Sequence, residues 1–269
     1  MIVINRAIRP PAFAGAFYPA SPNRLQKDLE TYLDQATPPE ITHVRALVAP
    51  HAGYVYSGGV AAFAYKLLGE QPVTPKRIYL LGPAHRVPFH GVSMTDYRAF
   101  KTPLGDHPLD TEKIQQLAAS GKVFNTLSAP HTPEHCLEVH IPFIQTVCPS
   151  VPVVPMLFGQ VDPVIVGKLL NETLEPEDLI IVSSDLSHFH ENEKAHILDR
   201  QFLDALLTGD LIGVAHGEAC GNAPAIALMT VAQQQGWTPQ LLDYRTSGDV
   251  TGEVRQVVGY ASVAYVRKD

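Results

Sequence analysis

The sequence predicts an α/β protein, a single-domain αβα sandwich around a central sheet that is largely parallel or mixed. Three apolar runs rich in β-branched residues each end at a small or turn-forming residue, and a histidine follows each run closely. Helical patterns lie between the runs, which indicates alternating strands and helices with helices on both faces of the sheet. The 269 residues, of which 45% are hydrophobic, suffice for one large core, so we expect one domain over residues 1–269.

Each of the three runs is expected to form a buried strand that leads into a loop. They are VRALVAP at residues 44–50, RIYLLGP at 77–83 and LIIVSSD at 179–185. Another strand is predicted for VPVVPMLF at 151–158. Near the end of the chain, DYRTSG at 243–248 and QVVGYASVAYVR, which follows it, indicate a pair of strands.

Helices are predicted where apolar residues recur at helical spacing. The segment SGGVAAFAYKLLG offers Ser57 as an N-cap and Gly69 as a terminator, so a helix is expected over residues 57–69. The other predicted helices span residues 22–35, 111–119, 164–170 and 194–207.

The composition favours a small-molecule partner. Charged residues make up 17% of the chain, the formal net charge is -7 and the sequence has no basic run, so neither nucleic-acid nor membrane binding is expected. The apolar run at residues 1–4 is too short for a signal peptide or a membrane helix. Three cysteines are an odd number, which fits reduced thiols better than a disulfide framework, and we expect a cytoplasmic protein.

Polar side chains follow three of the predicted strands at the point where each strand ends. His51 and His85 follow the first two, and Asp185 and His188 follow the third. In open α/β sheets ligands bind beyond the carboxyl ends of the strands, because the connecting loops converge there. Asp185 and His188 could therefore enter a pocket as ligands or proton-transfer groups. Taken alone, the histidines could instead cap strands, and Asp185 could be a helix N-cap.

Two further segments carry candidate residues. Cys220 lies at the start of an apolar, helix-like run, where orphan amides and the helix dipole would stabilise a thiolate as a ligand or nucleophile. The alternative is a small buried hydrophobe. In HTPEHCLEVHIPF, His135 and Glu138 stand three apart and would share one face of a helix, in either a supporting or a structural role.

Several common site types have no sequence support. The chain has no Gly-x-Gly-x-x-Gly after a strand, no Walker A sequence and no Gly-x-Ser-x-Gly elbow. It also lacks paired Cys-x-x-Cys motifs, which argues against a structural zinc site of that type.

Six segments, taken in order, resemble the signature blocks of one known family. They cover nearly the whole chain, and they are AGAFYPASP (14–22), APHAGYVYSG (49–58), GPAHRVP (82–88), EHCLEVHIPF (134–143), VSSDLSHF (182–189) and ACG (219–221). This is the pattern of the Memo family, whose bacterial and archaeal members are known as component B of the AmmeMemoRadiSam system.

The resemblance implies a fold similar to that of the class III extradiol ring-cleaving dioxygenases, which are non-haem iron enzymes. It implies that His51, His85 and Cys220 bind a metal, and that Asp185 and His188 are the pocket aspartate and histidine. Tyr18 and Tyr54 lie in the matching blocks, and we expect them to line the pocket or support the ligands, together with His135 and Glu138.

In the dioxygenases a carboxylate occupies the third ligand position, and the residue at the His188 position acts as acid and base. A thiolate at position 220 is softer, so ring cleavage does not follow from the fold. Cys136 is a second departure, because relatives more often carry serine in that block.

We therefore expect a redox protein that binds iron(II), or else copper or zinc, and acts on a small substrate that the sequence does not identify. One alternative is a non-catalytic adaptor, since eukaryotic relatives are described as binding phosphotyrosine peptides, although an arginine cluster of the kind that recognises phosphate is missing. Another is a hydrolase that uses zinc-bound water. Partners could include the radical-SAM protein of the named system.

Overall fold

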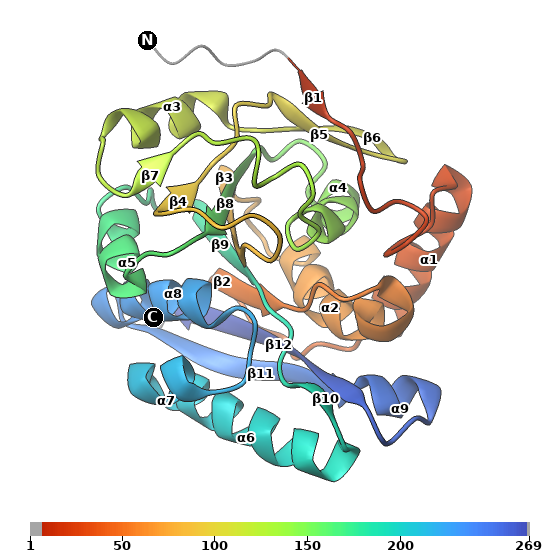
Figure 1. Cartoon of the computed structure of the whole chain (residues 1–269). Helices are drawn as coiled ribbons and strands as arrows, with labels where there is room; N and C mark the ends of the chain where they lie inside the picture. The colour runs from red at the N-terminus through yellow and green to blue at the C-terminus, as the bar shows by residue number, and fades with distance from the viewer. Residues whose placement is uncertain (1–6, 268–269) are drawn as a thin grey trace.

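A mixed sheet runs through the centre of the structure, and helices flank it (Figure 1). The computed structural model describes residues 7–267. Within these residues the strands of the main sheet are β2 (Val44–Ala49), β3 (Arg77–Pro83), β4 (Val92–Ser93), β7 (Phe124–Asn125), β8 (Val153–Phe158), β9 (Asp178–Ser183), β10 (His188–His190), β11 (Trp237–Thr246) and β12 (Val257–Arg267). Their order is β10-β12-β2-β9-β3-β8-β4-β7, and β11 also pairs with β12.

The middle of the sheet is parallel, and an antiparallel pair joins it to the next strand on each side. Strands β2, β9, β3 and β8 pair in parallel, whereas β12 runs antiparallel to β2 and β4 runs antiparallel to β8. Almost every residue of the four parallel strands is buried, which is why they read as continuous apolar runs. The predicted α/β class with a mixed sheet is confirmed.

Helices cover both faces because successive crossovers run in opposite directions. The chain passes from β2 through α2 (Tyr54–Gly69) to β3, and later returns from β8 through α5 (Pro163–Asn171) to β9. Right-handed crossovers that run in opposite directions place their helices on opposite faces. Helices α1 (Pro22–Gln35) and α4 (Ile141–Val147) pack with α2, whereas α8 (Asn222–Gln235) packs with α5.

The remaining elements lie around this framework. A second sheet has three strands in the order β1-β5-β6. The bounds of the remaining elements are β1 (Ile8–Arg9), β5 (Ala99–Thr102), β6 (Gly105–Pro108), α3 (Thr111–Ala119), the 3₁₀ helix η1 (Glu138–His140), α6 (Asn192–Thr208), α7 (Leu211–His216) and α9 (Ser247–Thr251).

The predicted helices are present, but the predicted start of α2 is wrong. Helix α2 begins at Tyr54, and Ser57 lies inside its first turn, where the hydroxyl donates to the carbonyl of Ala52 at 3.0 Å. A side-chain cap is not needed at Tyr54, because its amide donates to the carbonyl of Phe17 at 2.8 Å. The N-terminal segment therefore caps the helix through its backbone.

Buried apolar side chains fill the space between the sheet and its helices as one connected cluster. None of the helices in residues 7–267 is long and apolar enough to cross a membrane. The apolar run at residues 1–4, on which the expectation about a signal peptide rests, lies outside the described residues.

Acid should destabilise the fold, because His107 is buried in its neutral form. Its Nε2–H donates to the carbonyl of Val151 at 2.9 Å, and burial lowers the pKa of His107 to about 4. Between this value and the unfolded pKa near 6.5, the unfolded chain binds more protons, so stability present at neutral pH is lost as the pH falls. We expect protonation linked to His107 to lower the free energy of unfolding by on the order of 1–2 kcal/mol at pH 5 relative to neutral pH, measured by urea unfolding.

A His107→Gln variant keeps a donor at this position but does not titrate, so its free energy of unfolding should fall less steeply between pH 6.5 and 5. Equal slopes for the two proteins would contradict the assignment.

Candidate metal centre

Three adjacent parallel strands bring the candidate ligands to one edge of the sheet. Ala49 of β2 pairs with Ser183 of β9, so His51, which follows β2 by two residues, lies beside the end of β9. His85 follows β3, the neighbour of β9 on its other side. Ligand atoms of His51, His85 and Cys220 all lie within 4.8 Å of one another. Cys220 Sγ and His51 Nε2 lie 3.3 Å apart.

His51 is held as a neutral imidazole with Nε2 facing the other two residues. Its Nδ1 lies 2.7 Å from the hydroxyl of Ser183, and that hydroxyl donates its own proton to the carbonyl of Cys136 at 2.8 Å. Since the hydroxyl proton is committed, Nδ1 must be the donor, which leaves the lone pair on Nε2. Burial, and then the neighbouring His135 and His85, lower the pKa of His51 well below its usual value.

His85 is oriented by a buried carboxylate that our sequence reasoning did not select. Glu134 accepts from the backbone amide of His85 at 2.7 Å and from its Nδ1 at 2.9 Å. Burial opposes ionisation of Glu134, but these hydrogen bonds and the adjacent His135 ring hold its pKa well below the usual range. A carboxylate on Nδ1 leaves Nε2 of His85 as the ligand atom.

The expected stabilisation of the Cys220 thiolate by a helix terminus is not found. It lies two residues before α8, and its Sγ accepts from the amide of Asp185 at 3.2 Å. Burial, and then the Asp185 carboxylate, raise the pKa of the Cys220 thiol, so the helix dipole does not dominate. Gly221 permits this close approach, since a Cβ there would lie 2.4 Å from the Cβ of Ser184.

Asp185 and His188 lie in the loop and short strand that follow β9. Oδ1 of Asp185 accepts from the backbone amide of His51 at 2.7 Å, and Oδ2 lies 3.9 Å from Nε2 of His51. Burial raises the pKa of Asp185, although the hydrogen bond from His51 works in the opposite direction. His188 begins β10 and is half-buried, so Asp185 is not the N-cap of a helix.

The prediction that one helix carries both His135 and Glu138 is wrong. His135 precedes the 3₁₀ helix η1, in which Glu138 is the first residue. The ring of His135 stacks on His85, with centroids 4.8 Å apart. Glu138 instead accepts from Nη1 of Arg9 at 2.5 Å and from the hydroxyl of Tyr18 at 2.6 Å.

The hydroxyls of the two tyrosines expected near the pocket are engaged in internal hydrogen bonds. That of Tyr18 binds Glu138, and that of Tyr54 donates to the carbonyl of Val139 at 2.6 Å. Both side chains are buried, so they support the turn that contains Glu138 and do not present hydroxyls to a ligand. A second group of candidate ligand atoms, His85, Glu134 and His135, shares His85 with the first.

A shallow hollow lies beside Asp185 and His188. Tyr56, Phe189, Val258 and Tyr260 are among its lining residues, and Phe189 is 69% exposed. Val258 of the lining pairs with His188, and Phe189 follows His188 in the chain, so the hollow borders the short strand that carries His188. Phe189 has a φ of 60°, a conformation that bulky residues rarely adopt, and the pairing of His188 and His190 with β12 fixes it.

A family model described as Memo-like protein matches residues 9–264. The chain belongs to the Memo family. A MEMO1 family protein of Methanopyrus kandleri is 33% identical over 281 residues, covering 96% of this chain and 99% of the relative. Another from Methanosarcina acetivorans is 34% identical over 270 residues, covering 95% and 98%. The family predicted from the signature blocks is therefore confirmed.

This Memo-family chain also resembles a solved structure in its fold. The crystal structure of an uncharacterized protein from Escherichia coli K12 matches with a TM-score of 0.51 over 82% of this chain and 99% of that one. The two sequences are 14% identical, so the likeness concerns the α/β architecture alone.

Removing the buried partner of Glu138 should strongly destabilise this Memo-family fold. Arg9 binds Glu138 with both side chains almost fully buried, and its other nitrogens donate to the carbonyls of His131 and Glu134. Arg9→Met leaves an uncompensated buried carboxylate, which should cost about 3–5 kcal/mol in urea unfolding. The control is Arg24→Met, which breaks an exposed pair with Asp28 and should cost at most about 1 kcal/mol. Equal costs for the two variants would contradict a structural role for the buried pair.

Proposed function

We propose that the protein binds one redox-active metal ion, iron(II) in the first instance, through His51, His85 and Cys220, and acts as an oxidoreductase on a small substrate. The observation that carries the proposal is the convergence of three ligand atoms whose side chains are already oriented toward one another. Each histidine has its Nδ1 engaged by an acceptor, so each offers Nε2.

The donor set fits a metal of this kind. Metal–nitrogen bonds of about 2.0–2.1 Å and metal–sulfur bonds of about 2.3 Å place neighbouring ligand atoms roughly 3–4.4 Å apart. The distance of 3.3 Å between Cys220 Sγ and His51 Nε2 lies in this range. The ligand atoms of all three residues lie within 4.8 Å of one another, so only a small movement of the side chains would bring them to bonding distance of one metal ion. Two imidazoles and a thiolate suit iron, copper or zinc better than magnesium or calcium.

The bound metal would supply Lewis acidity and electron transfer, and its charge would favour the thiolate of Cys220. The protein residues around it perform three tasks. Glu134 and Ser183 fix the two imidazoles, while Asp185 holds the backbone of His51. His188, half-buried at the start of β10, is the proposed proton carrier toward the substrate.

The hollow beside His188 supports a small substrate with an apolar or aromatic part. Its aromatic lining offers surface on which a ring could stack. The proposal includes the partners that the family resemblance implies, among them a radical-SAM protein. A cytoplasmic location belongs to it as well, since the three cysteines are free thiols and a reducing compartment would keep them so.

Metal content should depend on the named ligands. Anaerobically purified protein should contain close to one iron or copper per chain by elemental analysis, and Cys220→Ser and His51→Ala should each lose it. The matched controls are Cys148→Ser, which alters a buried cysteine just after α4, and His196→Ala, which alters an exposed histidine on α6. Both controls should retain the metal.

Absence of metal in the unaltered protein would overturn the proposal and favour the adaptor hypothesis. Zinc as the only metal, with hydrolysis of an ester or amide, would favour the hydrolase hypothesis. Failure of iron-loaded or copper-loaded protein to consume oxygen with phenolic substrates or reductants would remove the redox part.

Glu134 should matter for metal affinity without being a ligand. Glu134→Gln keeps the shape of the side chain but replaces a charged acceptor with a neutral amide, so the orientation and basicity of His85 should weaken. We expect a loss of about 10–100-fold in affinity, measured by competition with a chromophoric chelator. Glu172→Gln, an exposed residue paired with Lys122, is the matched control and should be unchanged. Equal affinities for the two variants would show that Glu134 does not support the centre.

A further inference from the structure

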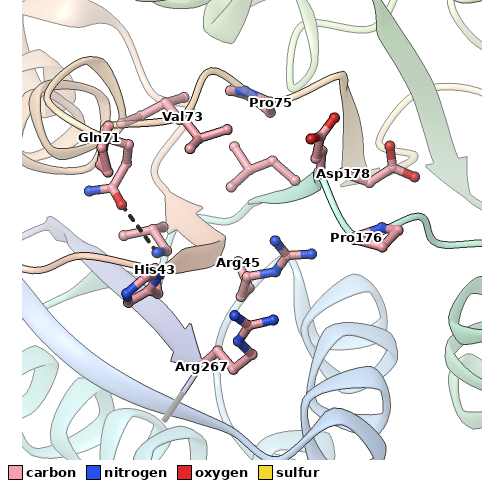
Figure 2. Close-up of a pocket in the computed structure, with 13 residues that line it drawn as sticks. His43, Arg45, Gln71, Val73, Pro75, Pro176, Asp178 and Arg267 are labelled. Carbon is pink, nitrogen blue, oxygen red and sulfur yellow. Dashed lines mark hydrogen bonds between the residues drawn. The ribbon is translucent and has the colours of Figure 1, made fainter. Parts of the chain in front are cut away.

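A second cavity lies at the opposite end of the sheet from the candidate metal centre. It has a volume of about 300 Å³ and forms where β2 and β9 begin and β12 ends (Figure 2). His51 and Asp185 follow the carboxyl ends of the same two parallel strands, so the length of the sheet separates the two sites. The lining residues are His43, Val44, Arg45, Leu68, Gln71, Pro72, Val73, Pro75, Pro176, Glu177, Asp178, Leu179 and Arg267.

Two arginines reach into this cavity from neighbouring strands. Val44 pairs with Val266 in the antiparallel contact of β2 with β12, which brings Arg45 close to Arg267. Figure 2 shows both guanidinium groups directed toward the same region of the pocket. Among residues 7–267, no carboxylate lies within ion-pairing distance of either guanidinium.

Arg45 is held in place although this position is costly for a cation. It is half-buried, and its guanidinium lies over the ring of Trp237, 5.6 Å from the centroid. Burial, and then the charge of Arg267, lower the pKa of Arg45. Arg45 is therefore partly desolvated and has the like charge of the exposed Arg267 nearby, and a bound anion would relieve both costs.

The acidic residue across the pocket is paired with another arginine, Arg77, which also binds Asp110 and Glu175. Asp178 accepts two hydrogen bonds from Nη1 of Arg77, at 3.0 and 3.1 Å, and a third from the amide of Glu175 at 2.8 Å. Figure 2 shows Asp178 across the pocket from Arg45 and Arg267. Glu177 is exposed at the margin. Within residues 7–267, Arg45 and Arg267 are therefore the arginines of the lining that no carboxylate pairs with.

Much of the remaining wall is apolar, and prolines stiffen it. Leu68, Val73 and Leu179 contribute aliphatic surface, and three prolines restrict the two loops that close the cavity. A preformed apolar wall facing a pair of cations suits a ligand with one anionic group and one apolar part. Guanidinium groups match the planar or tetrahedral oxygens of carboxylates and phosphates.

We propose that this cavity binds a small organic anion, in which a carboxylate or phosphate contacts Arg45 and Arg267 and an apolar group lies against Val73 and Leu179. The inference is independent of the metal centre, because no residue is shared between the two sites.

Titration calorimetry with phenylacetate and phenyl phosphate tests the proposal and separates the two anion types. Benzyl alcohol serves as the neutral probe. All proteins carry Cys220→Ser, so that anions cannot bind through a metal there, and Asp269→Asn, which removes a side-chain carboxylate close to Arg267 in the sequence. At least one anion should bind, and Arg45→Gln/Arg267→Gln should weaken it by about tenfold or more.

The matched control is Arg24→Gln/Arg255→Gln, which removes two exposed positive charges elsewhere and should leave binding unchanged. A second variant, Val73→Glu, adds a negative charge at an exposed position of the opposite wall and should also weaken the anion, without altering either arginine. The proposal is overturned if neither anion binds, if benzyl alcohol binds equally well, or if the arginine variant and its control bind alike.

Discussion

The parallel pairing of β2, β9 and β3 is the constraint on which the candidate centre depends. His51, Asp185 and His85 are separated by tens of residues or more in sequence, yet each follows one of three adjacent strands that end at the same edge. Parallel strands need long crossover connections, and those crossovers are the helices that bury the sheet. The packing that stabilises the core therefore also sets the distances among the ligand atoms.

Two buried carboxylates in one short segment connect the N-terminal region to this edge. Glu138 binds Arg9 and Tyr18, while Glu134, four residues earlier, binds His85. Arg9 also donates to the backbone carbonyl of Glu134, so one guanidinium fixes the segment that carries both carboxylates. A buried charge without a partner is destabilising. Loss of Arg9 would leave Glu138 without its counter-charge and would also loosen the segment whose Glu134 orients His85, so the two carboxylates depend on the same guanidinium.

Local patterns predicted the main helices and strands and most of the polar residues at the carboxyl ends of the parallel strands, because these features depend on short stretches of sequence. Apolar runs followed by His51 and His85 are visible without knowledge of the fold, whereas the family resemblance favoured a ligand role for Cys220 over that of a small buried hydrophobe. Glu134 and Ser183 were missed, since the sequence does not show which polar side chain turns toward a ring nitrogen. The prediction of Ser57 as the N-cap was wrong for a related reason. The amide of Tyr54 donates to the carbonyl of Phe17, a contact between distant segments that a local pattern does not show.

The two ends of the sheet present opposite chemistry, and strand direction explains the difference. At the carboxyl ends of β2 and β9, loops supply imidazoles, a thiol and an aspartate, whose neutral or anionic character suits a cation. At the opposite end, antiparallel β12 finishes where β2 begins, so Arg267 meets Arg45 through a pairing that spans more than 200 residues. No short motif could have indicated that meeting. The two proposals thus assign a cation to one end of the sheet and an organic anion to the other, with the length of the sheet between the charges of the two sites.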